Sequence, residues 1–242
     1  MQLEHELRKI KDKHFADYFG IANLTSATEF ICSQGGSELK KYPTAITMGI
    51  ALFDDIVDLL PKRDSRAVCV AYKHHCYDVI NNRLDFIISE MSSFLNNQGF
   101  HVYPVPASKR VNDDDIHAVF SHKLAAHLSG LGWIGKSCLL VTPDNGPRVR
   151  FASLLTNAPL SLTGSPIEDG CGDCTECVEI CPVQAFTGKP FNDDEPREVR
   201  YNAKKCENYF SYIQEENDWA FCGMCVYVCP YGREQNNKKA LV

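Results

Sequence analysis

The chain has 242 residues, of which 44% are hydrophobic and 23% charged, and its formal net charge is −6 at pH 7. These values are typical of a soluble globular protein with room for one large domain and one small one, or for two modest ones, and no apolar run approaches the length of a membrane span. Because the first ten residues are charged and lack a signal-peptide core, we expect a cytoplasmic protein without a membrane partner. The negative charge gives no global attraction to nucleic acid, although a local basic patch could still bind RNA.

The first part of the chain predicts a helix followed by strands. Apolar residues recur near helical spacing between charges over residues 1–30, which predicts helix there. Residues 45–50 and 66–72 are rich in branched side chains, so we expect two buried strands. Between them, residues 53–61 predict a short acidic helix or loop that ends at a proline.

The middle of the chain alternates between helical and extended patterns. Residues 82–97 form the clearest helix, because apolar residues fall at i, i+3, i+4, i+7 and i+11 and Gly99 follows as a stop. A strand is expected at 100–106, and a second helix at 120–131. The remaining predicted strands of this part are 137–142 and 149–156. This alternation predicts an α/β layer domain over residues 1–160, with a hinge at 161–166 into a second domain over 161–242.

The second domain is dominated by cysteines at fixed spacing. Cys171 begins a C-x2-C-x2-C-x3-C-P run, and Cys222 begins a C-x2-C-x3-C-P run, with Cys206 upstream of the latter. Eight cysteines in two sets of four, each ending in Cys-Pro, are the ligand set of a protein with two [4Fe–4S] clusters. A cubane needs four thiolates at its corners, and the tight loop wraps three of them around one face.

The fourth cysteine of such a run binds the other cluster, and this rule assigns every ligand. We call the resulting sets the first and second quartets. The first quartet comprises Cys171, Cys174, Cys177 and Cys229. The second quartet comprises Cys181, Cys206, Cys222 and Cys225.

Two other uses of these cysteines compete with the clusters. Disulfides are disfavoured because nothing marks the chain as secreted. Two zinc sites would use the same number of cysteines. Zinc ribbons, however, usually pair one C-x2-C with another and need neither the third close cysteine nor the Cys-Pro endings, so we favour clusters.

Several segments upstream of the cysteines resemble one known family. They are Gly130-Leu-Gly-Trp-Ile-Gly-Lys136, Gly146-Pro-Arg-Val-Arg150 and Leu155-Thr-Asn-Ala-Pro-Leu160. Together with the cluster motifs, they resemble the epoxyqueuosine reductases and, more distantly, the reductive dehalogenases, from about residue 121 to residue 230. The resemblance implies a nitroreductase-like α/β domain that holds cobalamin, followed by a small ferredoxin-like domain with two [4Fe–4S] clusters. It also implies that electrons pass from cluster to cluster and then to cobalt.

The resemblance extends to the cofactor loop, for which a structural role is the alternative. It implies that Gly132, Trp133, Ile134, Gly135 and Lys136 contact cobalamin, although a glycine-rich turn with a buried tryptophan has the same pattern. Lys136 would then hold an anionic group, or else be a solvated lysine. Arg148 would bind an anion, or else pair with acidic side chains of the protein.

The proton donor is less well marked. Where the family has its general acid, an ungapped comparison places Ile116, and Asp115 is one residue away. Asp115 ends an acidic run that is usually a solvated turn, but a carboxylate near cobalt could protonate a product. Because histidine as a residue type can exchange a proton near neutral pH, His122 or His117 could do the same, unless it is a capping or core residue. We therefore name Asp115 and His122 as catalytic candidates.

These features favour an iron–sulfur oxidoreductase, a short paralogue of the family, that reduces an unknown substrate with cobalamin; FMN is the second choice of cofactor. An electron donor of the ferredoxin or flavodoxin type is expected as a partner. The alternatives are an electron-transfer or accessory protein without substrate chemistry, and the tRNA epoxyqueuosine reductase itself, with tRNA in place of a small-molecule substrate.

Overall fold

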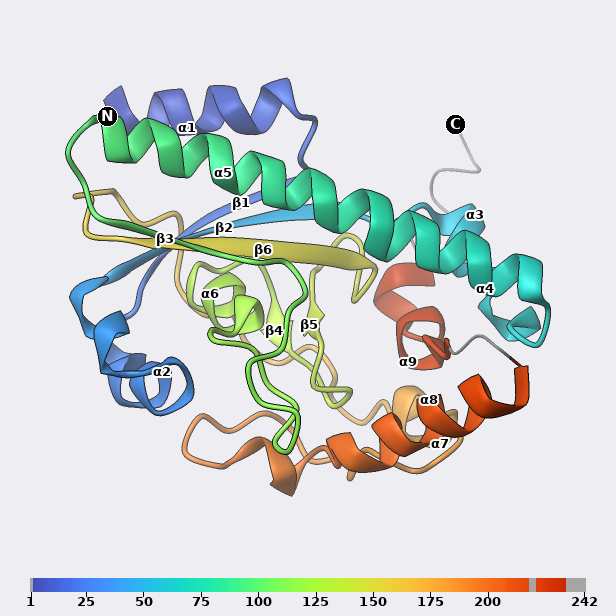
Figure 1. Ribbon diagram of the computed structural model, residues 1–242. Coiled ribbons are helices and arrows are strands. Elements are labelled where there is room, and N and C mark those ends of the chain that lie inside the picture. The colour runs from blue at the N-terminus through green and yellow to red at the C-terminus, as the bar shows by residue number, and fades with distance from the viewer. Residues whose placement is uncertain (1, 218–220, 234–242) are drawn as a thin grey trace. The chain divides into compact units, whose positions relative to one another are not determined.

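A computed structural model of the protein describes residues 2–217 and 221–233 (Figure 1). The described residues fall into two compact units. The first unit comprises residues 1–51, 79–131 and 150–167, and the second comprises residues 52–78, 132–149 and 168–242. The second unit thus contains the cysteine motifs and also two earlier segments of the chain. The boundary that the sequence predicts at residue 160 lies inside the last segment of the first unit, and the two-domain division stays a prediction.

The first unit contains a four-stranded sheet with the strand order β1-β2-β6-β3. Strands β1 and β2 pair antiparallel, with Ile21 opposite Ile46, and so do β3 and β6, with Val105 opposite Ser153. The strands are β1 (Tyr18–Asn23), β2 (Thr44–Ala51), β3 (Val102–Val105) and β6 (Val149–Thr156).

Helices cover the sheet of this unit. Figure 1 shows α1 and α5 along one face and α6 on the other, where α6 packs against β1 and β2. The helices are α1 (Gln2–Lys13), α2 (Thr28–Gly35), α5 (Asn81–Asn97) and α6 (His122–Leu128), with short 3-10 turns η1 (Thr25–Ala27) and η2 (Ser37–Lys41). Buried apolar side chains from both strands and helices, among them Leu24, Phe120 and Leu155, form the core between α2, α6 and the sheet.

Two elements of this unit confirm the sequence pattern directly. The apolar side chains of α5 that recur at helical spacing are all at most 1% exposed, so this stripe faces the core as the periodicity requires. Strand β2 is buried on both faces, which explains its continuous apolar run. The strand predicted at 100–106 is present as β3, and the one predicted at 149–156 is β6.

The second unit is built from short elements. They are α3 (Asp54–Val57), η3 (Leu60–Lys62), α4 (Arg66–Lys73), the π-helix η4 (His74–Ile80), whose end reaches into the first unit, the strands β4 (Trp133–Ile134) and β5 (Leu140–Val141), α7 (Glu176–Glu179), η5 (Arg197–Val199), α8 (Ala203–Asn217) and α9 (Met224–Tyr227). Strands β4 and β5 form an antiparallel pair. Helices α7 and α9, which carry cysteines of both motifs, pack against each other.

The predicted strand at 66–72 is wrong, because this segment is the helix α4. Cys69 and Tyr72 are its buried residues and lie three positions apart on one helix face, whereas Val70 is 55% exposed. The branched residues favour a strand by propensity alone. Burial of one helical face decides the structure instead, since propensity is a weak prior against tertiary packing.

The helix predicted over residues 1–30 is also only partly correct. Helix α1 covers the first part of this range. Residues 18–23 form the strand β1 instead, whose buried residues 19–22 pair with β2. The strand predicted at 137–142 shortens to β5, because Cys138 adopts a left-handed conformation with φ of 55°. A residue in this conformation interrupts an extended strand.

The architecture is a mixed α/β fold with an open sheet, as the sequence predicts. The nitroreductase-like and ferredoxin-like details stay predictions. Within the described ranges, no helix is both long and apolar enough to cross a membrane.

Candidate iron–sulfur centre

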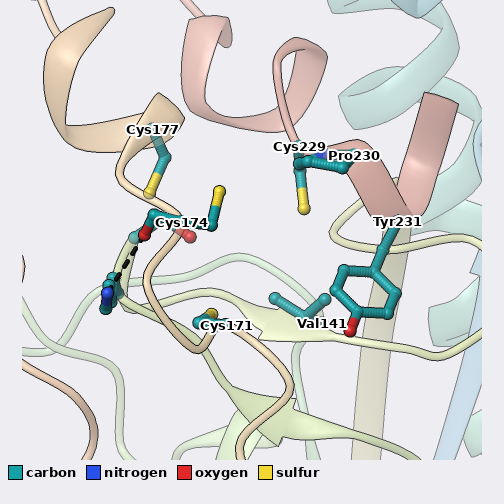
Figure 2. A pocket seen from close by; sticks show the side chains of 9 residues that line it. Val141, Cys171, Cys174, Cys177, Cys229, Pro230 and Tyr231 are labelled. Carbon is teal, nitrogen blue, oxygen red and sulfur yellow. Dashed lines mark hydrogen bonds between the residues drawn. The ribbon is translucent and has the colours of Figure 1, made fainter.

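The first quartet lines one pocket of the second unit. Cys171, Cys174 and Cys177 come from a single loop, and Cys229 comes from the turn that follows α9. Figure 2 shows the four side chains around a common space, with Pro230, Tyr231 and Val141 at its wall. The crossing that the ligand rule predicts therefore has a geometric counterpart, because the distant cysteine shares a pocket with the three local ones.

The thiols of this pocket influence one another's ionisation. Burial is the main cause that raises the pKa of Cys177 to about 12, and the neighbouring thiols of Cys171, Cys229 and Cys174 add to it. Burial likewise raises the pKa of Cys229 to about 11, with Cys171 and Cys174 contributing. Ionising all four thiols would bring mutually repelling charges together, and a cationic metal between them would offset that repulsion, so the grouping fits a metal cluster.

The second quartet is also brought together. Burial raises the pKa of Cys222, and the thiols of Cys206 and Cys181 raise it further. Burial raises the pKa of Cys225 as well, and the nearby thiols of Cys222, Cys206, Cys177 and Cys181 raise it further. Cys181 is thus a neighbour of the thiols from the second motif, and Cys177 of the first quartet is close enough to affect Cys225.

Within the described residues, no three or more His, Cys, Asp or Glu side chains are grouped as they would be around one metal ion.

Gly223 shapes the start of the second motif. Its φ of +67° is left-handed, and a Cβ on it would lie 2.8 Å from Cδ1 of Leu60. The backbone conformation therefore favours glycine at this position. The residue lets the chain turn between Cys222 and Cys225, so that α9 can begin at Met224.

The predicted cofactor loop packs against the first cysteine loop. Trp133 donates its indole N–H to Cys171 Sγ at 3.4 Å, and Lys136 Nζ donates to the carbonyl oxygens of Gly172 at 2.6 Å and Cys174 at 3.1 Å. A Cβ on Gly135 would lie 3.2 Å from Cys171 Sγ, and one on Gly132 would lie 2.3 Å from the carbonyl oxygen of Val141. Trp133, Gly135 and Lys136 therefore lie against the cysteine loop. Ile134, which lies between them in the chain, is buried.

Arg148 is one of the most deeply buried side chains, with 1% of its surface exposed. Its Nη1 donates to Asp54 Oδ1 at 2.8 Å, and its Nη2 donates to Asp58 Oδ1 at 2.7 Å and to the Tyr227 carbonyl at 3.2 Å. The guanidinium thus ties α3 to the last residue of α9. The sequence suggested acidic partners for Arg148 but did not identify Asp54 and Asp58, because nothing local marks a contact across such a separation.

Two further residues beside the second quartet have no signal in the sequence. The phenol of Tyr201 is half-buried, and burial and a hydrogen bond to Cys206 raise its pKa. The charge of Arg63 opposes the effect of burial on Cys222 by lowering the pKa of that thiol. Arg63 is far from the cysteine motifs in the sequence, and Tyr201 lies outside their regular spacing. Only the fold shows that both are near the second quartet.

The two catalytic candidates lie in the first unit. Asp115 is on an exposed turn, where its backbone N–H donates to Asn112 Oδ1 at 2.9 Å and its Oδ2 accepts from Asn112 Nδ2 at 3.2 Å. His122 begins α6, and its Nε2 lies 3.0 Å from the Pro106 carbonyl while its Nδ1 lies 3.1 Å from Ser153 Oγ. Since a carbonyl only accepts, Nε2 carries the proton and Nδ1 accepts from Ser153. Their proposed roles in proton transfer stay predictions.

His122 is expected to make stability depend on pH. Burial is the main cause that lowers its pKa to about 4, and the charge of Arg150 adds to it. Because the unfolded histidine has a pKa of about 6.5, the folded protein binds fewer protons between these values. The contribution of His122 to the free energy of unfolding should therefore be fully present above about pH 6.5 and be lost as the pH decreases towards 4.

The measurement is urea unfolding at pH steps across this window, for the protein and for His122→Gln. Glutamine keeps a donor and an acceptor but does not titrate, so the difference between the two curves isolates the histidine from the carboxylates. We expect the variant to lose less stability on acidification. Parallel curves would show that His122 is not the group responsible.

Comparison with known proteins places these features in a family. The 4Fe-4S double cluster binding domain matches residues 170–232, which contain all eight cysteines of the two quartets. An epoxyqueuosine reductase from Cellulophaga algicola is 31% identical over 166 residues, which cover 67% of this chain. The chain thus contains a 4Fe-4S double cluster binding domain and is similar to the epoxyqueuosine reductases.

Solved structures agree with this family at the level of the fold. A crystal structure of epoxyqueuosine reductase with an epoxyqueuosine-modified tRNA stem loop is similar with a TM-score of 0.63 and 18% identity, covering 97% of this chain and 66% of that one. A reductive dehalogenase, whose structure suggests a mechanism for B12-dependent dehalogenation, has a TM-score of 0.63 and 19% identity, covering 96% of this chain and 33% of that one. The open-sheet α/β fold is thus shared by epoxyqueuosine reductases and reductive dehalogenases.

The sequence matches cover only part of the relatives. The match spans 50% of the Cellulophaga epoxyqueuosine reductase and 28% of one from Listeria monocytogenes. The relatedness therefore supports an iron–sulfur oxidoreductase, while the substrate and the second cofactor have to be argued from this chain.

Proposed function

We propose that the protein is a reductase that holds two [4Fe–4S] clusters, one on the first quartet and one on the second. The pocket shared by Cys171, Cys174, Cys177 and Cys229 carries this proposal. When bound, such clusters supply single-electron transfer. The chain contributes the thiolate ligands and buried surroundings that limit the access of water.

The interleaved quartets suit electron transfer between the two sites. Cys181 and Cys177 come from one short segment around α7, yet they belong to different quartets. Cys225 and Cys229 are similarly divided at the two ends of α9. Short pieces of backbone therefore link both quartets, and the influence of Cys177 on Cys225 supports their closeness.

Cobalamin is our proposal for the cofactor that receives the electrons, and it rests on the likeness to a B12-dependent dehalogenase. The residues that we assigned to it fit less well. Lys136 is engaged by two carbonyl oxygens of the cysteine loop, and Arg148 by two carboxylates. These contacts favour a structural role for both side chains, so we derive no step of the reaction from a corrin.

The test is metal and cofactor analysis of protein purified without oxygen. We expect about eight iron atoms per chain, four for each cubane, and a corrinoid absorption band that survives desalting after incubation with cobalamin. Zinc in place of iron would overturn the cluster assignment. Bound FMN without corrinoid uptake would reject cobalamin and leave the clusters intact.

An electron-transfer protein without its own substrate is the second candidate. The engagement of Lys136 and Arg148 within the second unit favours it, because their charges are then used to build the cluster site. This function predicts reversible reduction of the clusters, no corrinoid uptake and a stable complex with a partner reductase. An external donor of the ferredoxin or flavodoxin type is proposed in either case.

Transfer RNA is the remaining candidate substrate. One structural relative was solved with a modified tRNA stem loop, and this motivates a direct assay. Expression of the chain in cells that lack their own epoxyqueuosine reductase should restore queuosine in tRNA if the chain performs that reaction. A matched chain with Cys174→Ser serves as the inactive control, and no queuosine in either would direct the search to small molecules.

A further inference from the structure

The indole of Trp133 is held in a fixed position against the first quartet. The side chain is 4% exposed, and its Nε1–H donates to Cys171 Sγ at 3.4 Å. The ring meets that of Tyr231 edge-on, with centroids 4.7 Å apart and an interplanar angle of 76°. Trp133 is thus a buried hydrogen-bond donor to a sulfur that lines the pocket.

Gly170 and Tyr231 pack closely against the Trp133 ring. A Cβ on Gly170 would lie 2.8 Å from the Trp133 ring and 2.8 Å from the Tyr231 hydroxyl. That hydroxyl donates to the Gly170 carbonyl at 2.9 Å, which fixes the turn just before Cys171. Gly170 thus leaves space for both rings, and the Tyr231 hydroxyl holds the residue that precedes Cys171.

We propose that Trp133 is a positioning residue that raises the reduction potential of the cluster on the first quartet through its hydrogen bond to Cys171. This inference rests on the proposed function, because it requires that the quartet holds a cluster. It assigns to Trp133 a role different from the contact with cobalamin that the sequence suggests.

The direction follows from electrostatics. Reduction adds an electron to the cluster and makes its ligand sulfurs more negative, so a donor to one sulfur stabilises the reduced state more than the oxidised state. The indole is neutral and buried, so the bond is little screened by water. Removal of the N–H should therefore lower the potential, because the oxidised state loses less.

The second quartet offers a matched case. The phenol of Tyr201 hydrogen-bonds to Cys206, and its ring stacks on Phe186 with centroids 5.1 Å apart. Tyr201 is thus the counterpart of Trp133 at the second quartet, with a half-buried ring whose hydroxyl hydrogen-bonds to one cysteine. Each residue can be replaced by phenylalanine, and each variant is then the control for the other.

The experiment is a potentiometric titration followed by electron paramagnetic resonance, on the iron-loaded protein, on Trp133→Phe and on Tyr201→Phe. Two one-electron steps are expected. Trp133→Phe should lower the reduction potential of one step by at least about 28 mV. At a fixed potential this raises the ratio of oxidised to reduced cluster at least threefold, since about 59 mV corresponds to a tenfold change for one electron. Tyr201→Phe should lower the other step and leave the first unchanged.

The outcomes separate this inference from the proposed function. Protein that assembles no cluster would refute the proposed function. Two loaded clusters whose potentials do not change in Trp133→Phe, or change equally in both variants, would refute the role of Trp133. If Trp133→Phe fails to load, the tryptophan analogue β-(3-benzothienyl)alanine can be placed at position 133. The other tryptophan, Trp219, is first changed to phenylalanine, so that only position 133 carries the analogue. The analogue keeps the ring size and removes only the N–H, so the same shift is expected.

Discussion

Replacement of Cys229 by serine is expected to remove about four of about eight iron atoms, although Cys229 belongs to the later cysteine motif. The reason is that its side chain shares a pocket with Cys171, Cys174 and Cys177, so the serine variant leaves the first quartet with three thiols. The measurements are iron content and the cluster signal in electron paramagnetic resonance. Cys32→Ser, which changes a cysteine of α2 outside both quartets, is the matched control and should keep all of the iron.

Double variants then test the crossing itself. Cys229→Ser combined with Cys171→Ser should lose no more iron than either single variant, because both belong to one quartet. Cys229→Ser combined with Cys222→Ser should lose nearly all of it. If the pairing were uncrossed, with Cys229 and Cys222 in one quartet, these two results would be exchanged. Far-UV circular dichroism and gel filtration distinguish cluster loss from unfolding.

The second large effect concerns the charge of Arg148. Its guanidinium is 1% exposed, whereas the side chains of Asp54 and Asp58 are 28% and 44% exposed. Changing both carboxylates to Asn keeps their size but leaves a buried cation without a counter-charge, which costs about 3–5 kcal/mol of the free energy of unfolding. Arg148→Met should cost less, because water can reach both carboxylates.

Urea unfolding of the iron-loaded protein under anaerobic conditions measures this asymmetry. Glu6→Gln is the control, since Glu6 pairs with Lys9 on the surface of α1 and exposed pairs of this kind contribute little to stability. A larger loss in Arg148→Met than in the double Asp variant would contradict the account. That result would mean that contacts of the arginine other than its ion pairs hold α3 and α9 in place.

The sequence was most informative where the signal is local. Three thiols within seven residues predict a metal loop, and the apolar stripe of α5 predicts a buried helix face, because both patterns repeat over a short stretch. The helix α4 was missed because valine favours strands, whereas the fold needs Cys69 and Tyr72 on one face. Here a local preference was overruled by packing with residues that are distant in the chain.

The site shows the same limit. The sequence predicts a cofactor contact for the segment around Trp133 but does not indicate Cys171 as the partner of the indole, because the two meet only after folding. Arg148 was singled out while Asp54 and Asp58, about ninety positions earlier, had no pattern to connect them to it. Periodicity and motif spacing report on neighbours in sequence, so contacts between distant segments require the fold.

The crossed quartets also bear on how the protein is made. The ribosome releases Cys171, Cys174, Cys177 and Cys181 well before Cys225 and Cys229, and each quartet needs one of those two late residues. A nascent chain that has emerged only as far as Cys206 therefore has neither ligand set complete. With the crossed assignment proposed above, cluster delivery should follow the emergence of Cys225 and Cys229, and the early thiols have to be kept reduced until then.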